Sequence, residues 1–149
     1  MRGRPPDDEF VGRLRLSVTR LARLLRQQDE GDMTPTVAAT LATIAREGPL
    51  TLGELAAAEQ VAPPTVTKVT AKLEAAGLID RIVDSTDRRV CRVALSAAGR
   101  KQVELNRSRR TAWLADRLSL LSPDEQKRLV AAVDVLEHLT TAPRPVDAP

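Results

Sequence analysis

Residues 63–72 combine side chains that can hydrogen-bond to nucleic acid with a lack of acidic groups. At about 100° per residue, a helix here places Val66, Val69 and Leu73 on one narrow face. The candidate contact residues on the remaining surface are Pro63, Pro64, Thr65, Thr67, Lys68 and Lys72. Hydroxyl and ammonium groups can reach base edges and phosphates. Because no Asp or Glu lies between Val61 and Leu73, we interpret this segment as a DNA-reading helix. An ordinary amphipathic surface helix is the alternative.

A second basic group follows at residues 84–89, a polar stretch between two short apolar runs. Arg88 and Arg89 lie at its tip, and arginine suits the negative potential of a narrow minor groove. We expect Asp87 to hold the Arg89 guanidinium in a bidentate pair. The alternative is a solvated turn whose surface salt bridge contributes little.

Charge is segregated along the chain, whose net charge is +3. Residues 29–62 carry one basic and six acidic side chains, whereas residues 63–100 carry seven basic and four acidic ones. Segregated charge is typical of a protein with a nucleic-acid-binding face. Chance clustering on a solvated surface is the competing explanation.

The elements that must position these groups begin with a predicted helix over 8–28. Its apolar side chains recur at alternating spacings of three and four residues, namely Val11, Leu14, Val18, Leu21 and Leu25. A second helix starts at Thr34 and Pro35 and stops at Gly48. Leu50 and Thr51 allow only a minimal strand, and Thr51 and Glu54 form a capping box that opens a helix over 52–59.

The second half of the chain begins with the helix opened by Pro63, which runs to Ala76 and ends at Gly77. Two short strands, 78–84 and 90–95, surround the polar hairpin. A helix over about 97–120 follows, and a capping box at Ser122–Glu125 opens a last helix that ends before Pro143.

This order predicts a mostly α fold with a small β-hairpin wing, a winged helix-turn-helix with N- and C-terminal dimerisation helices. We assign 34–96 to the DNA-binding domain, 8–30 and 97–141 to dimerisation helices, and 1–7 and 142–149 to flexible tails. The helices flanking the winged domain have more apolar surface than one small domain covers, which favours a homodimer.

Five motifs occur in the order seen in one protein family. They are Thr51-Leu-Gly-Glu-Leu-Ala56, Pro63-Pro-Thr-Val-Thr-Lys68, Leu73-Glu-Ala-Ala-Gly-Leu-Ile79, Asp84-x-x-Asp-Arg-Arg89 and Leu95-Ser-x-x-Gly99. Together they resemble the MarR family of bacterial transcription regulators. The resemblance covers residues 10–140 and implies a homodimer with interleaved flanking helices that binds a pseudo-palindromic operator in double-stranded DNA, with Asp87 and Arg89 as the D-x-R pair of the wing. Two positions depart from the family pattern: Ala62 stands where a serine cap is frequent, and Lys68 where arginine is frequent.

The composition argues against other classes of function. One cysteine excludes an internal disulfide and a CxxC zinc site, and one histidine excludes a His-rich metal centre. No phosphate-binding loop or catalytic carboxylate motif occurs, so we expect no enzyme activity, no cofactor and no metal. No stretch is long enough for a membrane span, and the N-terminus lacks an apolar signal region, so the expected compartment is the cytoplasm.

Cys91 lies in the second predicted strand, where we expect a small packing role and no redox role. The sequence thus predicts a DNA-binding regulator, most simply a repressor. A small anionic or aromatic effector would bind where the dimer helices meet the winged domain. The alternatives are a winged-helix module for protein–protein interaction and a regulator without a small-molecule effector.

Overall fold

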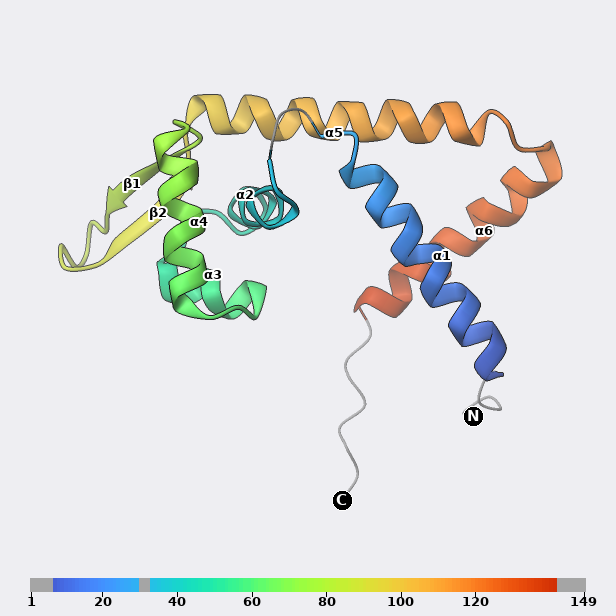
Figure 1. Ribbon diagram of the computed structural model, residues 1–149, viewed down its shortest axis with the longest axis horizontal. Helices are drawn as coiled ribbons and strands as arrows, with labels where there is room; N and C mark the ends of the chain where they lie inside the picture. Colours follow the sequence, from blue (N-terminus) through green and yellow to red (C-terminus); the bar gives the residue numbers. More distant parts are fainter. Residues whose placement is uncertain (1–6, 30–32, 142–149) are drawn as a thin grey trace, which may run out of the picture. The chain divides into compact units, whose positions relative to one another are not determined.

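The computed structural model describes residues 7–29 and 33–141 (Figure 1). These residues form six helices and one antiparallel hairpin, in the order α1 (Asp8–Arg26), α2 (Pro35–Glu47), α3 (Leu52–Glu59), α4 (Pro63–Ala75), β1 (Ile79–Val83), β2 (Cys91–Leu95), α5 (Ala97–Leu118) and α6 (Pro123–Thr141). The predicted fold class is confirmed. The predicted tails lie outside the described residues, except Asp7, whose side chain caps α1. None of the described helices is long and apolar enough to cross a membrane.

The chain divides into two compact units, and the boundary falls within α5, between Thr111 and Ala112. The core of the first unit lies where α2, α3, α4 and the base of the hairpin meet. Its most deeply buried apolar side chains are Leu41, Ile44, Leu55, Val66, Leu73 and Val93. Figure 1 shows α4 between the hairpin and α2, so α4 forms the centre of this unit.

Local capping explains where the helices of the winged domain begin and end. Thr34 accepts a hydrogen bond from the Val37 N–H (3.4 Å) and begins α2. Thr51 and Glu54 form both bonds of the predicted capping box, at 3.1 and 2.8 Å, and begin α3. After α2 and α4 the chain turns at Gly48 and Gly77, whose φ angles are 82° and 69°. The sequence therefore predicted these ends to within two residues.

The hairpin pairs Ile79 with Leu95 at its base and Val83 with Cys91 at its outer end. Leu50 adds a single antiparallel bridge to β2, exchanging two backbone hydrogen bonds with Val93 (3.1 and 2.7 Å). This is the minimal strand that the sequence predicted. Because Val93 is buried and the outer residues are not, the core supports the base of the wing and leaves its tip in solvent.

The start of α5 is hydrogen-bonded to the turn that ends α4. The Ser96 hydroxyl donates to the Gly77 carbonyl (2.6 Å) and accepts from the Gly99 N–H (3.0 Å). The Ser96 N–H donates to the Leu78 carbonyl (3.1 Å). A Cβ atom at Gly99 would lie 1.9 Å from the Leu78 carbonyl oxygen, so only glycine permits this approach. The junction therefore joins the end of α4 to the first turns of α5.

We predict that Gly99→Ala destabilises the protein by about 1–3 kcal/mol, because backbone must move to admit the methyl group. Urea unfolding followed by circular dichroism measures the change. Gly53→Ala is the matched control, since its Cβ would meet Thr51 Oγ1 at an ordinary 3.9 Å. It should be neutral or stabilising by up to about 1 kcal/mol. Equal midpoints for the two variants would show that the junction tolerates a side chain.

Candidate nucleic-acid interface

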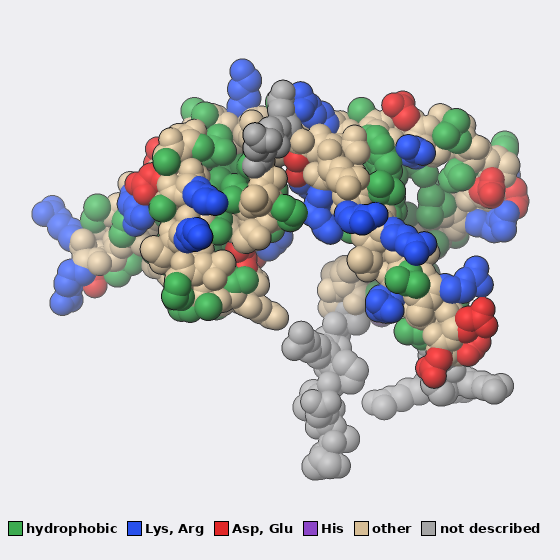
Figure 2. Space-filling model, viewed as in Figure 1, with side chains coloured by type: hydrophobic (Ala, Val, Ile, Leu, Met, Phe, Trp, Pro, Cys, Tyr) green, Lys and Arg blue, Asp and Glu red, His purple; other side chains and the backbone are tan. Residues whose placement is uncertain are grey.

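The predicted face of α4 is solvent-exposed. Val66, Val69 and Leu73 are at most 7% exposed and anchor the helix in the core. The six residues of α4 that the sequence singled out are all exposed: Pro63, Pro64, Thr65, Thr67, Lys68 and Lys72. Neither lysine has an ion-pair partner within the described part of the chain. Figure 2 shows basic side chains over α4 and at the tip of the hairpin.

The beginning of α4 has no free backbone donors to offer to a phosphate. Pro63 and Pro64 have no N–H, and the N–H groups of Thr65 and Val66 donate to the Ala62 carbonyl, at 2.9 and 3.4 Å. A capping side chain at position 62 would therefore have no free N–H group to accept a hydrogen bond from, which explains why α4 begins without a side-chain cap at Ala62. Contacts from this end of the helix must come from side chains.

The three threonines of α4 have different hydrogen-bonding states. Thr70 is buried and donates to the Val66 carbonyl (2.8 Å), so it belongs to the core. The Thr67 hydroxyl donates to the Pro63 carbonyl (3.1 Å), which leaves its lone pairs available as acceptors. Thr65 forms no hydroxyl bond within the described residues, so it can both donate and accept.

The tip of the wing is organised by two aspartates. One oxygen of Asp84 accepts from the Thr86 N–H (2.9 Å) and hydroxyl (2.5 Å). One oxygen of Asp87 accepts from the Arg89 N–H (2.9 Å) and from Arg89 Nε (3.3 Å). The predicted bidentate pair was wrong, because the guanidinium donates only through Nε to a single oxygen of Asp87. The second donor to that oxygen is the Arg89 backbone N–H. The Arg89 side chain is 92% exposed, and Arg88 is exposed beside it.

Arg92 is a residue of the wing that sequence reasoning missed. Its Nε donates to Asp84 (2.8 Å), and its Nη1 donates to Glu54 (2.7 Å) and to the Pro49 carbonyl (3.4 Å). Glu54 is at the same time the capping-box residue of α3. Arg92 therefore fastens the wing to the start of α3 and to the loop before it. Two of these partners are 38 and 43 residues away in sequence, so local spacing could not reveal them.

This network changes the titration of its two carboxylates. The Arg92 guanidinium, followed by the hydrogen bonds from Thr86, holds the pKa of Asp84 well below its usual range. The backbone N–H of Thr51, followed by the Arg92 charge, lowers the pKa of Glu54. Both carboxylates are therefore held in the charged form that pairs with Arg92.

Cys91 is exposed, so the expected packing role was wrong. It lies on the same face of β2 as buried Val93, but two residues nearer the tip, opposite Val83. The helices of the core cover only the base of the hairpin, which leaves the thiol in solvent.

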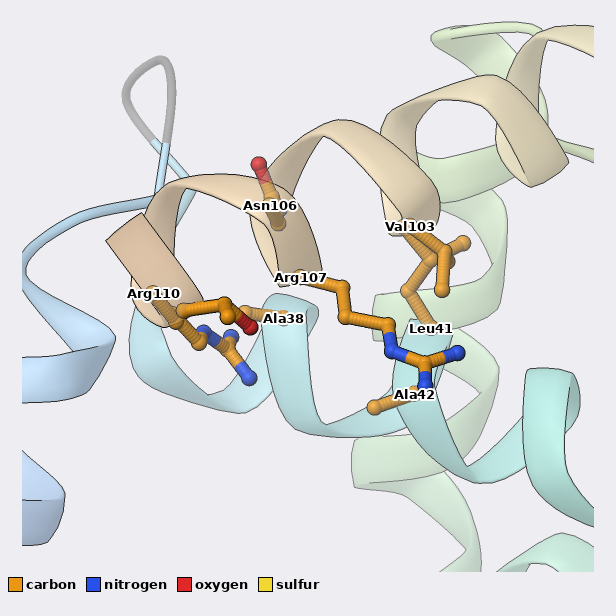
Figure 3. A pocket seen from close by; sticks show the side chains of 8 residues that line it. Ala38, Leu41, Ala42, Val103, Asn106, Arg107 and Arg110 are labelled. Atoms are coloured by element: carbon orange, nitrogen blue, oxygen red, sulfur yellow. The ribbon is translucent and has the colours of Figure 1, made fainter. Parts of the chain in front are cut away.

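A cavity of about 180 Å³ lies between α2 and the first half of α5 (Figure 3). It is lined by Ala38, Leu41, Ala42, Val103, Asn106, Arg107, Arg110 and Thr111. The α2 wall is aliphatic, and Figure 3 shows the Arg107 side chain extending toward Ala42. The described residues contain no cluster of metal-ligating side chains.

A helix-turn-helix whose second helix exposes no acidic side chain from Pro63 to Lys72, flanked by a basic two-stranded wing, defines a winged-helix DNA-binding protein. The model of the MarR family matches residues 33–91. An uncharacterized HTH-type transcriptional regulator of Mycobacterium leprae is 36% identical over 134 residues, covering 89% of this chain and 94% of that protein. The chain therefore belongs to the MarR family of transcriptional regulators, as its motifs suggested.

Two further relatives have more informative names. The HTH-type transcriptional repressor MdtR of Bacillus subtilis is 29% identical over 123 residues, which cover 79% of each chain. A solved structure of a mutant of MepR from S. aureus, bound to an oligodeoxyribonucleotide, has a TM-score of 0.67 and 26% identity. The match covers 89% of this chain and 98% of that one.

We predict that Asp84→Asn makes the stability of the protein less sensitive to acid. Because folding depresses the pKa of Asp84, its charge stabilises the fold above the ordinary value of 3.8, and this stabilisation is lost as the pH falls. The variant should have the lower urea midpoint at neutral pH, and the difference between the two midpoints should begin to narrow once the pH falls below about 4.

Asp80→Asn is the control, because Asp80 is exposed on β1 and has no ion-pair partner in the described segments. It should keep the acid dependence of the wild type. Parallel acid dependences for wild type and Asp84→Asn would contradict the proposed role of the Arg92 network.

Proposed function

We propose that the chain is a transcriptional repressor that binds a pseudo-palindromic operator as a homodimer. One α4 enters the major groove at each half-site, and each wing reaches the adjacent minor groove or backbone. The observation that carries this proposal is the exposed surface of α4 from Pro63 to Lys72, which presents hydroxyls and unpaired lysines without an acidic side chain. The acidic residue of α4, Glu74, follows this stretch and pairs with Arg81. The DNA-bound MepR structure and the name of MdtR support DNA binding and repression, respectively.

The proposed contacts divide by side-chain chemistry. Thr65, Thr67 and Lys68 meet base edges, and the small rings of Pro63 and Pro64 let the helix approach closely. Lys72, nearer the end of the helix, meets phosphate. Arg88 and Arg89 contact the minor groove or backbone, and Asp87 limits the directions that Arg89 can take.

We predict that Lys68→Ala weakens operator binding by about 1–3 kcal/mol and relaxes the base preference at one position of each half-site. The measurement is fluorescence anisotropy on a duplex selected from random sequence by the wild-type protein, beside an unrelated duplex. An equal loss on both duplexes would mean that Lys68 meets phosphate only.

Lys101→Ala, which removes an exposed lysine of α5, is the matched control and should leave both affinities unchanged. If Lys68→Ala folds, assembles and binds the selected duplex like the wild type, α4 does not present the face that we assign to DNA.

The exposed apolar side chains of the flanking helices support assembly into a homodimer. They also support our assignment of 8–30 and 97–141 to dimerisation, around a DNA-binding domain at 34–96. Neither α1 nor α6 has a buried residue. The apolar side chains that α1 exposes are Phe10, Val11, Leu16, Val18, Leu21 and Leu24. Those of α6 are Leu129, Val130, Val133, Val135 and Leu139. So many exposed apolar side chains on a helix are costly in water and are typically covered by a second subunit.

We predict a solution mass of about twice the 16.2 kDa of one chain, measured by light scattering at micromolar concentration. Leu21→Glu should shift the protein toward the monomer, because it places a charge in the apolar stripe of α1. A wild-type mass of one chain across this concentration range would end the dimer model.

We further propose that a small anionic effector binds in the cavity between α2 and α5. Two arginines line it, and none of its lining residues is aromatic, which favours an anion over a stacked ring. An effector there would change the separation of the two α4 helices and so release DNA. We propose that the protein acts in the cytoplasm, with the DNA that it binds.

A further inference from the structure

Helix α1 carries several arginines and no acidic side chain after its first turn. Asp8 and Glu9 lie in that turn, and no Asp or Glu follows before the helix ends at Arg26. Five exposed arginines form what we call the arginine face: Arg13, Arg15, Arg20, Arg23 and Arg26. None of them has an ion-pair partner among residues 7–29 and 33–141. Figure 2 shows basic side chains along this helix.

The arginine face lies opposite the apolar stripe of α1. At about 100° per residue, the arginines span an arc of roughly 160°, centred on the side of the helix away from Val11, Val18 and Leu21. This arc contains one large apolar side chain, Leu16, which is 44% exposed. No residue of α1 is buried or belongs to the core of the winged domain. A second copy of the chain that covers the apolar stripe therefore leaves the arginine face in solvent.

The helix itself accounts for only part of this charge. Arg23 and Arg26 lie in the last turn, where a positive charge interacts favourably with the helix dipole. Arg13 and Arg20 have no such role, and like charges gathered on one side of a helix repel each other. Asp29, which follows α1, does not neutralise them, because both of its carboxylate oxygens accept from the guanidinium of Arg110 in α5. The compensating negative charge must come from a partner.

We propose that the arginine face of α1 binds the phosphate backbone of double-stranded DNA without base preference, at a second site separate from α4 and the wing. Guanidinium groups match the geometry of phosphate oxygens. The face extends for about 20 Å from Arg13 to Arg26, at 1.5 Å per residue. Duplex DNA carries one negative charge per about 1.7 Å of its axis, so a face of this length meets several phosphates.

A protein with both sites occupied holds two duplex segments together. This bridging rests on the proposed function, because it requires DNA on α4 as well. The binding of phosphate by α1 does not rest on it, since no residue of α4 or the wing takes part.

Two other partners fit the arginine face less well. An anionic membrane binds helices whose apolar side chains enter the headgroup region below the charges. In α1 the apolar stripe is on the opposite side, where we place the dimer contact. An acidic protein partner is typically held by buried apolar or aromatic anchors, and the face offers only Leu16. Binding to a DNA backbone requires repeated positive charge alone.

Arg13→Gln/Arg20→Gln tests the proposal, because it removes the two charges that the helix dipole explains least. Glutamine has a helix propensity close to that of arginine, so the double variant should keep the helix content and the mass of the wild type. The matched control is Lys101→Gln/Lys127→Gln, which removes the same net charge from exposed positions of α5 and α6. Circular dichroism and light scattering check both proteins.

Each protein is first mixed with one equivalent, per dimer, of a short unlabelled duplex selected by the wild type. A labelled duplex of unrelated sequence is then titrated and followed by fluorescence anisotropy. The wild type should bind it, and Arg13→Gln/Arg20→Gln should bind it at least about fivefold more weakly. The control should match the wild type, and all three proteins should bind the selected duplex alone with equal affinity.

The salt dependence of the second binding event supplies a measurement on the wild type that needs no variant. Each phosphate contact contributes about 0.9 to the slope of log K against log salt concentration, so four or five arginines predict a slope of about −4. The slope should be smaller in magnitude by about 2 for Arg13→Gln/Arg20→Gln and unchanged for the control. A wild-type slope near zero would overturn the proposal.

Other outcomes would also overturn it. These are an absence of unrelated duplex on the premixed wild type, equal weakening in the two double variants, and an equal loss of the selected and unrelated duplexes in the arginine variant. Tighter binding of poly-L-glutamate than of duplex, at equal charge concentration, would assign the arginine face to an acidic protein instead.

Failure of the proposed function gives a different result. If selection by the wild type yields no preferred duplex, the unrelated duplex is titrated into each protein alone. Dependence of this affinity on Arg13 and Arg20, and not on the control lysines, would then support the second site while the proposed function fails. Independence from these two arginines would contradict the second site as well.

Discussion

Three buried side chains on one face of α4 determine which of its other side chains are exposed to solvent. Val66, Val69 and Leu73 pack against α2, α3 and the base of the hairpin, so the helix has one rotational setting. In this setting Thr65, Thr67 and Lys68 are exposed. A polar side chain at any of the three core positions would remove the anchor and, with it, the orientation of the proposed contacts. The face that we propose for DNA binding thus depends on the hydrophobic face behind it.

The sequence predicted the features that are set locally. Thr34, the Thr51–Glu54 capping box, Gly48 and Gly77 act on backbone within four residues, and the structure has each helix end where these residues place it. The buried face of α4 was predictable for the same reason, since helical periodicity determines which side chains share a face. The single bridge of Leu50 was also expected from the brevity of its segment.

The contacts that the sequence did not predict join distant segments or compete with backbone groups. Arg92 meets Glu54, and Arg110 meets Asp29, across 38 and 81 residues, and one arginine among many does not identify its partner. Cys91 was misplaced because strand alternation gives the face of a residue but not how far the core extends beneath it. The Asp87–Arg89 pair is not bidentate as predicted, because the Arg89 backbone N–H and Nε both donate to one oxygen of Asp87.

Hydroxyl-radical footprinting on the duplex selected by the wild-type protein tests the central claim most directly, because it locates both copies of α4 at once. A two-fold dimer that reads DNA with this helix should protect two tracts on one face of the duplex. Their centres should lie about one helical turn, roughly 34 Å, apart. A single protected tract, or two tracts on opposite faces, would contradict the assignment of α4 as the DNA-reading element of a homodimer.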